Sequence, residues 1–438
     1  MSRKRVLVVF PTAWDERQLA ALPAEVRARY ELTFDEPRDE DVRWDFDVLG
    51  YIEARARAWR GRIDGVFSSS DYPGAVAAAA IAAALGLAGA GPRNVLQASH
   101  KYYARLVQRR AAPEAVPDFG LFDPADERSW PRQFPCFVKP VRGSFSLFAR
   151  RMDDRQALLV FARSPALAEF RTHYVRLFDE LCTRYADFEH RGRAFLAEEL
   201  LGGAQATVEG WVDASGAHVL GLVDTLFHPQ STSFAGFHYP SRLPPEIQER
   251  MGRIACDVAL AFGLGPTLFN VEFFHDPSRG RVSLIEVNPR LCGQFGDLYE
   301  KVDGTNGFEL ALALACGETP CVRHGAGGFR SAASIPLRIF RSVRVRSAPP
   351  AAQQREVERR FPGTLVWSDC RSGDELRVAN EVEDGHSARY GVLNLGGASR
   401  SDIQEKLATL ARELCFEFET QEPSRDEGGR SFPARLCS

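Results

Sequence analysis

Two apolar segments joined by a short turn, each carrying a glutamate, constrain the fold of this chain more than any other feature. Residues 268–274 and 282–287 have the composition of buried strands, and an Asp-Pro-Ser-Arg-Gly turn separates them. Because side chains alternate along a strand, Glu272 can face Glu286 across an antiparallel pair. Two crowded carboxylates need a cation nearby, so the hairpin predicts an ion-binding point. The alternative, a solvated strand face without a ligand, stays open for the hairpin taken alone.

The face that carries Glu286 also carries Asn288 and Arg290, because each lies two residues further along the chain. Carboxylate and amide oxygens suit Mg²⁺, and protein-bound Mg²⁺ usually bridges to substrate phosphates. A guanidinium group beside such a site suits the charge that develops on a transferring phosphoryl group. The expected metal ligands are therefore Glu272, Glu286 and Asn288. Arg290 is the expected catalytic arginine.

The order of strand-like and helix-like segments predicts an α/β and α+β chain of several units. Near the N-terminus, Val-rich strands alternate with helices, one of them rich in alanine, which is typical of a doubly wound parallel unit. A length of 438 residues suits two to four units. The expected limits are a Rossmann-like unit at 1–112, a small subdomain at 113–200, a large subdomain with the metal site at 201–328, a C-terminal subdomain at 329–420 and a polar tail at 421–438.

Local patterns in the middle of the chain predict further elements. Apolar runs indicate strands at 134–140 and 145–150, and a helical composition covers 154–189. Residues 228–244 are aromatic, with serine, threonine and proline interspersed, and are expected to form a loop near the site.

Composition excludes several classes of protein. The net charge of −3 gives no basic excess of the kind that nucleic-acid binding requires. The nine cysteines form no CxxC pairs, which argues against a disulfide framework or a zinc site and favours a reducing cytoplasm. No stretch approaches the roughly 20 apolar residues of a membrane span. We expect a cytoplasmic protein without a nucleic-acid or membrane partner.

Two lysines are candidates for phosphate binding. Lys139 ends an apolar strand, and the small-residue turn that contains Ser144 follows it. A lysine in this place can reach a phosphate while N–H groups of the turn cover it. Lys101 follows Ser99, the expected N-cap of a helix over 101–110. The helix dipole disfavours a lysine in the first turn, which indicates an anionic partner. Ordinary surface lysines are the alternative for both.

A third candidate is the strand at 195–203, which runs into two glycines. The end of such a strand leaves backbone N–H and C=O groups unpaired, and these can hydrogen-bond an adenine ring between apolar neighbours. A hairpin edge with two solvated glutamates is the alternative.

Taken in this order, these segments resemble the ATP-grasp superfamily, and within it the carboxylate–amine ligases, including amino-acid ligases. The resemblance covers about residues 5–320 and is carried by the segments 66–101, 137–146, 197–203 and 270–290. It implies an ATP-grasp fold, in which an N-terminal doubly wound parallel unit precedes two α+β subdomains that hold the nucleotide between them.

The resemblance also implies roles for single residues. Glu198 and Leu201 would meet adenine through their backbone, and Lys139 would act with Arg290 in catalysis. Arg338, in the C-terminal unit, is a further candidate as a second phosphate-side arginine. The residues expected to contact ATP are Lys101, Lys139, Ser144, Glu198, Glu199, Leu201 and Gln205.

Two positions depart from the family pattern. Relatives often have a glutamate where this chain has Gln205, and that glutamate holds the ribose hydroxyls. A glutamine accepts one hydrogen bond without charge, which puts nucleotide affinity or base preference in question. The loop at 142–148 is expected to cover the phosphates, and we call it the phosphate loop. It carries Leu147 and Phe148 where relatives often carry glycine, so it is stiffer and closes differently over ATP.

The expected activity is that of an ATP-dependent carboxylate–amine ligase. It would form an amide or peptide bond through an acyl phosphate and release ADP and phosphate. The expected cofactors are ATP and Mg²⁺, with Mn²⁺ as a substitute, and the expected substrates are a small carboxylate and an amine, amino acids among them. A homodimer is the default expectation for such enzymes.

Two alternatives stay open, and a third is disfavoured. A biotin-carboxylase-like subunit would activate bicarbonate, and a nucleotide-binding module would not turn ATP over. A dehydrogenase is disfavoured because no GxGxxG follows the first strand at 6–10.

Closure over the reacting groups is expected from the loops at 142–148 and 228–244. His228 and His238, in the second of these loops, are candidates for proton transfer or for shaping the acceptor pocket. A packing role is the alternative for each.

Overall fold

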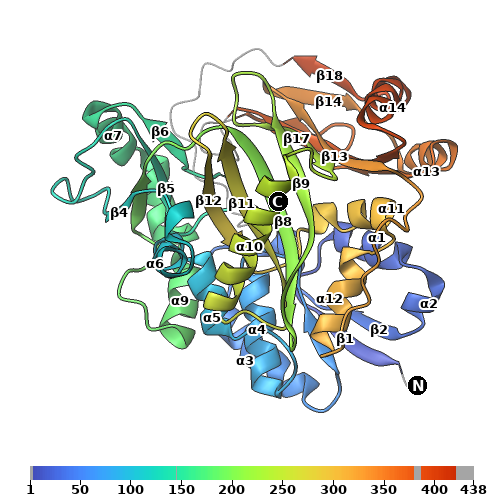
Figure 1. Ribbon diagram of the computed structural model, residues 1–438, viewed down its shortest axis with the longest axis horizontal. Helices are drawn as coiled ribbons and strands as arrows, with labels where there is room; N and C mark the ends of the chain where they lie inside the picture. The colour runs from blue at the N-terminus through green and yellow to red at the C-terminus, as the bar shows by residue number, and fades with distance from the viewer. Residues whose placement is uncertain (1–2, 145, 379–385, 421–438) are drawn as a thin grey trace.

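The computed structural model describes residues 3–144, 146–378 and 386–420, and its described part contains four β-sheets (Figure 1). The N-terminal sheet has three parallel strands in the order β2-β1-β3. Its central strand is valine-rich and buried on both faces, as expected for a parallel sheet covered by helices. Its strands are β1 (Lys4–Val8), β2 (Tyr30–Phe34) and β3 (Gly65–Phe67), and the accompanying helices are α1 (Ala13–Ala21), α2 (Ala24–Arg27), α3 (Val48–Trp59) and α4 (Gly74–Leu85).

Two helices connect this unit to the rest of the chain, α5 (Pro92–Ser99) and α6 (Lys101–Ala111). Ser99 is the last residue of α5, and His100 is the N-cap of α6, so the predicted N-cap at Ser99 is wrong. Helix α5 was not predicted; it begins with Pro92 at its first position, where the fixed φ of proline favours a helix. Lys101 still lies in the first turn of α6, as predicted.

The small sheet is antiparallel, with the order β4-β7-β5-β6. The predicted strand at 134–140 is confirmed as β5, but the strand at 145–150 is wrong. Residue 145 lies outside the described part, and residues 146–148 form a turn in which Phe148 has a φ of 56°. Phe148 is buried against Phe170, so the chain turns inward before it pairs. The strands are β4 (Phe119–Phe122), β5 (Cys136–Pro140), β6 (Arg150–Met152) and β7 (Phe195–Glu198).

The predicted helix over 154–189 is broken into four parts. Pro165 disfavours a helical conformation at Ser164, so the first helix ends there. The four parts are α7 (Arg155–Ala162), α8 (Pro165–Glu169), a π-helical turn (Phe170–Tyr174) and α9 (Arg176–Tyr185).

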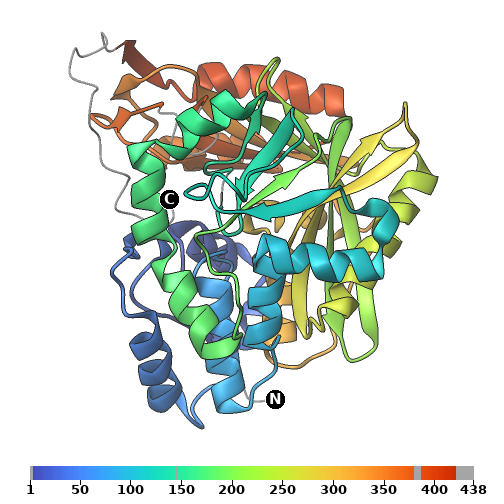
Figure 2. The same ribbon diagram turned by 90° about the vertical axis from the view of Figure 1, so that its left-hand side faces the viewer.

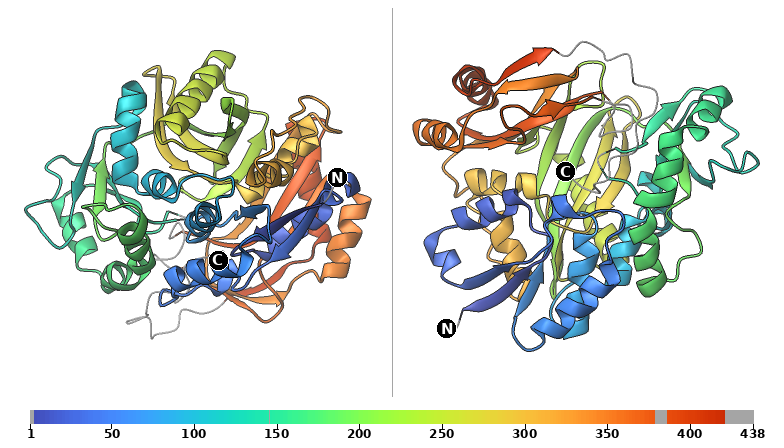
Figure 3. Two further views of the ribbon diagram at one scale, coloured as in Figure 1. Left: turned by 90° about the horizontal axis from the view of Figure 1, so that it is seen from below. Right: turned by 180° about the vertical axis from the view of Figure 1, so that it is seen from behind.

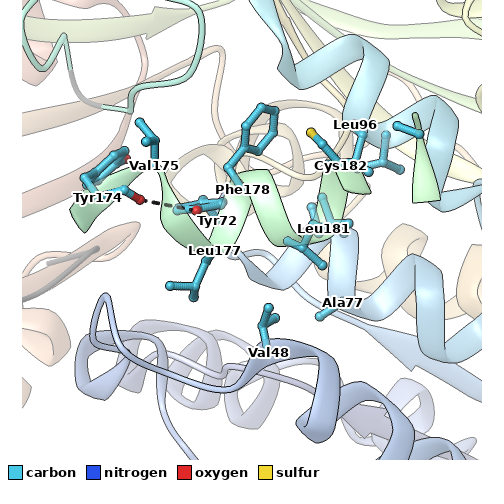
Figure 4. Close-up of a cluster of buried hydrophobic side chains, with 14 of the residues drawn as sticks. Val48, Tyr72, Ala77, Leu96, Tyr174, Val175, Leu177, Phe178, Leu181 and Cys182 are labelled. Atoms are coloured by element: carbon cyan, nitrogen blue, oxygen red, sulfur yellow. Dashed lines mark hydrogen bonds between the residues drawn. The ribbon is translucent and has the colours of Figure 1, made fainter. Parts of the chain in front are cut away.

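A cluster of buried side chains joins α9 to the N-terminal unit (Figure 4). Leu177, Phe178 and Leu181 of α9 are fully buried, and the two leucines point toward α3 and α4. Tyr72 lies in the same cluster and donates a hydrogen bond to the backbone oxygen of Tyr174, at 3.4 Å. Figure 2 shows α9 in green beside the blue N-terminal helices, where it contacts α3 and α5. This packing fixes the small sheet relative to the N-terminal unit.

The large sheet has eight strands in the order β12-β11-β8-β9-β10-β13-β17-β15. Residues 228–244 were predicted to be a loop, and this is wrong for β10, which pairs with β9 and β13. The aromatic side chains of this segment belong to a strand inside the sheet and not to a surface loop. The strands are β8 (Ala204–Asp213), β9 (Gly216–Phe227), β10 (Phe234–Tyr239), β11 (Thr267–Asp276), β12 (Arg281–Asn288), β13 (Ser331–Ile339), β15 (Thr364–Ser368) and β17 (Ala388–Gly397).

Within the large sheet, the C-terminal strands β13, β17 and β15 lie on the side away from the small sheet (Figure 3). A third small sheet, β16-β14-β18, lies beside the C-terminal strands. None of the helices in the described ranges is long and apolar enough to cross a membrane. The remaining elements are β14 (Val343–Ser347), β16 (Glu375–Leu376), β18 (Glu417–Thr420), α10 (Pro245–Ala261), α11 (Leu298–Asp303), α12 (Gly307–Ala315), α13 (Ala351–Arg360), α14 (Arg400–Glu413) and short 3₁₀ turns at 39–41, 113–115 and 293–295.

Candidate active site

The two predicted glutamates lie on the face of the large sheet that lines the main cleft. In the antiparallel pair β11–β12, Glu272 is directly opposite Glu286, and Asn270 is directly opposite Asn288. Directly opposed residues share one face of the sheet, with Cβ atoms about 4.5–5.5 Å apart. The predicted facing of the two carboxylates is confirmed. The role of these residues as metal ligands stays a prediction.

The electrostatics of the pair leave an acidic excess. Burial and the neighbouring Glu286 raise the pKa of Glu272 to about 8. Glu286 is half-buried, and although burial opposes it, Lys101 and Lys139 lower its pKa. Oε2 of Glu286 lies 3.2 Å from Nζ of Lys101. Because Glu272 has no such ion pair with a lysine or arginine among the described residues, the site fits a further cation.

The donor set also restricts which cation fits. In the described ranges no group of three or more His, Cys, Asp or Glu side chains is arranged to hold a metal ion. The hairpin therefore offers two carboxylates and one or two amide oxygens. Mg²⁺ is usually held by one or two carboxylates and takes its other ligands from phosphates and water, so these residues fit it.

The cleft has a volume of about 200 Å³ and lies between the large sheet, helix α6 and the phosphate loop. It brings together seven of the predicted residues, from five separate segments of the chain. These are Lys101, Ser144, Gln205, Glu272, Glu286, Asn288 and Arg290. Four other predicted residues lie outside its lining: Lys139, Glu198, Glu199 and Leu201.

Lys139 and Glu198 form a buried ion pair behind the cleft. Nζ of Lys139 lies 2.8 Å from Oε2 of Glu198 and donates to the backbone oxygen of Ile285, at 3.4 Å. Arg105 donates to the other oxygen of Glu198 at 2.7 Å and to the Ile285 oxygen at 2.8 Å. Although burial opposes it, Arg105 and Lys139 hold the pKa of Glu198 well below its usual range. Burial lowers the pKa of Lys139.

Asp71, in the loop after β3, ties three parts of the cleft together. It accepts hydrogen bonds from Arg142 at 2.9 Å and from the hydroxyl of Ser144 at 2.6 Å. Its other oxygen lies 3.5 Å from Nε of Arg290. Although Asp71 is buried, Arg142 and Arg290 hold its pKa well below its usual range. The phosphate loop is therefore held against the N-terminal unit beside the predicted catalytic arginine.

The segment predicted to meet adenine lies at the end of β7. Glu199 forms an ion pair with Arg281, and its backbone N–H donates to the oxygen of Asp118 at 3.0 Å. Leu201 follows, half-buried, just after the strand ends. Gln205, at the start of β8, donates to Oε2 of Glu272 at 3.1 Å. Its amide is thus engaged with the predicted metal site.

Three further candidates are not brought to the cleft. His238 follows Phe237 on β10 and, because side chains alternate, points to the opposite face of the sheet. Burial, with Arg400 nearby, lowers the pKa of His238 to about 4. His228 packs edge-on against Phe340, and Arg338 donates to Ser387 at 2.8 Å.

Sequence reasoning missed several cleft residues. Arg105 lies four residues after Lys101 and therefore on the same face of α6, so this spacing could have indicated that Arg105 lies near the cleft. Asp71, in the loop after β3, was not among the residues predicted for the site. Asn270, on β11, also lines the cleft, and Glu209 lies directly opposite it on β8, outside the lining; their alternation with apolar neighbours was the available pattern.

Residues 132–297 match the family model described as an ATP-grasp domain. The chain has an ATP-grasp fold. The fold class expected from the sequence is thereby confirmed, and the matched residues include β5, β7 and the β11–β12 hairpin. No curated protein matches the sequence.

Solved structures with an ATP-grasp fold align over nearly the whole chain. An L-amino acid ligase from Bacillus licheniformis is 17% identical, with a TM-score of 0.76, covering 96% of this chain and 100% of its own. An N5-carboxyaminoimidazole synthase from Aspergillus clavatus, in complex with ADP and 5-aminoimidazole ribonucleotide, is 12% identical, with a TM-score of 0.63 and coverages of 94% and 98%. A biotin carboxylase from Campylobacter jejuni is 14% identical, with a TM-score of 0.64 and coverages of 96% and 93%.

Proposed function

We propose that this chain is an ATP-dependent carboxylate–amine ligase that forms an amide bond through an acyl phosphate and releases ADP and phosphate. The observation that carries the proposal is the facing pair Glu272–Glu286, with Lys101 and Arg290 lining the same cleft. The similarity to a solved L-amino acid ligase supports the choice of an amine as nucleophile. The nucleotide would lie between the units at 113–200 and 201–328.

Each of the charged residues has a proposed task. Glu272, Glu286 and Asn288 would hold Mg²⁺, or Mn²⁺ in its place. When bound, this ion would supply fixed positive charge beside the phosphate oxygens. Lys101 and Arg290 would orient the γ-phosphate and offset its charge as a carboxylate approaches. Ser144 and the phosphate loop would cover the phosphates, and the backbone of Glu198, Glu199 and Leu201 would meet adenine.

The proposed ligase reaction overcomes the poor leaving group of a free carboxylate. A free carboxylate resists an amine because an oxide ion would have to leave. Transfer of the γ-phosphoryl group to a carboxylate oxygen turns that oxygen into part of a phosphate, which leaves readily when the amine attacks the carbonyl carbon. Water must be excluded between the two steps. Asp71 would help to exclude water, because it holds Arg142 and Ser144 of the phosphate loop together.

Isotope transfer provides a direct test. The protein is incubated with ATP, Mg²⁺, an amine and a panel of carboxylic acids labelled with ¹⁸O, and the released phosphate is examined by mass spectrometry. We expect one labelled oxygen per phosphate, in release that needs both the acid and the amine. Label transfer from bicarbonate alone would favour a carboxylase. ATP binding without any phosphate release would favour a module without turnover.

A further inference from the structure

The cleft has two chemically different ends. One end is the charged hairpin at Glu272 and Glu286, and the other is formed by three aromatic side chains, Phe234, Phe237 and Phe295. We call these three residues the phenylalanine wall. Neither the family match nor the roles proposed above assign it a task, although it lies on the same face of the sheet as the charged end.

The sheet register sets the distance between the two ends. Phe237 on β10 is directly opposite Thr225 on β9, which is directly opposite Gln205 on β8, and Gln205 lines the cleft. Four strand spacings separate β10 from β12, where Glu286 lies, so the backbones of these two strands are about 19 Å apart, and the side chains and the loop after β12 lie between them. One continuous face therefore carries the predicted metal site at one end and the phenylalanine wall at the other.

The loop after β12 connects the two ends. Arg290 begins it, and the N–H of Cys292 donates to Glu209 on β8 at 2.7 Å. The side chain of Gln294 then donates to Ser334 on β13 at 2.8 Å. The loop thus crosses the face of the sheet from β12 to β13. Alternate residues of this loop, Arg290, Cys292 and Gln294, line the cleft as far as Phe295, so a molecule whose carboxylate lies at Arg290 can extend along it toward the phenylalanine wall.

The three rings of the phenylalanine wall pack against one another and are only partly covered. The rings of Phe234 and Phe237 have centroids 5.0 Å apart, and those of Phe237 and Phe295 are also 5.0 Å apart. Phe237 and Phe295 are buried, whereas Phe234 is half-buried at the lining of the cleft. Three fixed rings offer dispersion contacts and no hydrogen bonds, so they suit an apolar group and not a small hydrated anion.

We propose that the phenylalanine wall binds a bulky apolar substituent of the carboxylate substrate, of the size of a phenylalanine or leucine side chain. The inference rests on the proposed ligase function and names the class of acid that the enzyme activates. Burial of a side chain of this size against the wall favours such acids over alanine by about 10- to 100-fold. Bicarbonate, which has no apolar part, gains nothing from the wall.

The kinetic experiment uses hydroxylamine as the nucleophile, because it traps an acyl phosphate whatever the natural amine is. ADP release is measured with phenylalanine, leucine, alanine and bicarbonate in turn. We expect kcat/KM to be about 10- to 100-fold higher for phenylalanine and leucine than for alanine. Phe234→Ala should remove most of this preference while the KM for ATP stays the same. The matched control is Phe34→Ala, at an exposed phenylalanine on β2, which should leave the preference intact.

A binding experiment separates the inference from the proposed function. Thermal unfolding is followed with Mg²⁺ and ADP, with and without each acid, in the wild-type protein and in Phe234→Ala. If phenylalanine raises the midpoint in the wild-type protein alone but no acid releases ADP, the phenylalanine wall stands and the ligase proposal falls. If alanine or bicarbonate is turned over as well as phenylalanine, the ligase stands and the inference is overturned. If no apolar acid binds, the inference is overturned as well.

Discussion

Three glutamates on the two sheets around the cleft have different partners and therefore different acidities. Glu198 lies between two cations, Arg105 and Lys139, and its pKa is well below its usual range. Glu272 faces another carboxylate, and burial together with Glu286 raises its pKa to about 8. Burial raises the pKa of both carboxyl groups, so the charge of their partners decides the direction of the shift.

Glu209 is an intermediate case. Its oxygens accept hydrogen bonds from the N–H of Cys292 at 2.7 Å and from the hydroxyl of Tyr299 at 3.1 Å, which are neutral donors. Burial raises its pKa to about 7, and these two hydrogen bonds oppose the rise. A carboxylate with cationic partners can stay ionised inside the protein and stabilise the fold. A carboxylate without such partners needs a bound cation or a proton to offset its charge.

The largest expected effect is on turnover, from the acidic pair. Glu286→Gln should leave the fold intact and lower turnover by about 10³-fold, because it removes charge that would hold the metal ion and the phosphates. Phosphate release is the measurement, with the thermal midpoint as the check on folding. Glu356→Gln, at an exposed glutamate that pairs with Arg359, is the matched control and should be unaffected. Full activity in Glu286→Gln would defeat the assignment of the site.

The next effect is on stability, from the compensated cluster. Glu198→Gln leaves Arg105 and Lys139 buried without their anionic partner, which should lower the free energy of unfolding by about 3 kcal/mol. Urea unfolding measures it. The neighbouring Glu199→Gln is the control, since its ion pair with Arg281 is partly exposed and should cost less than about 1 kcal/mol. Equal losses of unfolding free energy in the two variants would show that burial does not make the Glu198 cluster more stabilising than a partly exposed ion pair.

The sequence was sufficient to predict the parts of this comparison that follow from local periodicity. Strand alternation placed Glu272 opposite Glu286, and the strand ending at Lys139 was also found. The buried cluster of Lys139, Glu198 and Arg105 could not be found in this way, because Arg105 and Glu198 are 93 residues apart and meet only through packing.

The aromatic composition of residues 228–244 led to the wrong prediction of a loop where β10 forms. Residues 234–239 pair between β9 and β13, and β13 is about 100 residues away along the chain. A local pattern does not encode a strand that is stabilised by such distant neighbours. The turn at Phe148 was missed for a related reason, since burial against Phe170 decides its conformation.

Glu209 provides a test of acidity that involves no ligand. Its pKa is about 7 in the folded protein, and the ordinary value for a glutamate is 4.5. Between these pH values the unfolded chain releases a proton that the folded chain keeps, so folding stability falls as the pH rises. The loss is on the order of 3 kcal/mol, from 2.5 pKa units at 1.36 kcal/mol each. Glu209→Gln should lack this part of the pH dependence.

Urea unfolding at pH 5 and pH 8 measures the difference for Glu209→Gln. The wild-type protein should lose more stability between the two pH values than the variant does. Glu356→Gln serves again as the control, because it removes a glutamate whose ion pair with Arg359 lies at the surface. A variant that follows the wild-type profile at both pH values would show that Glu209 ionises normally.

The smallest expected effect concerns Gln205, which donates a hydrogen bond to Glu272 at 3.1 Å. Gln205→Ala removes one hydrogen bond, worth about 1 kcal/mol, from the carboxylate that lacks a cationic partner. We expect the KM for ATP to rise about five-fold with kcat nearly unchanged, because the amide supports the ground-state nucleotide site and not the transferring phosphoryl group. Gln248→Ala, on α10, is the matched control. A fall in kcat instead would mean that Gln205 acts through Glu272 on the transition state, which would place this neutral residue with the acidic pair.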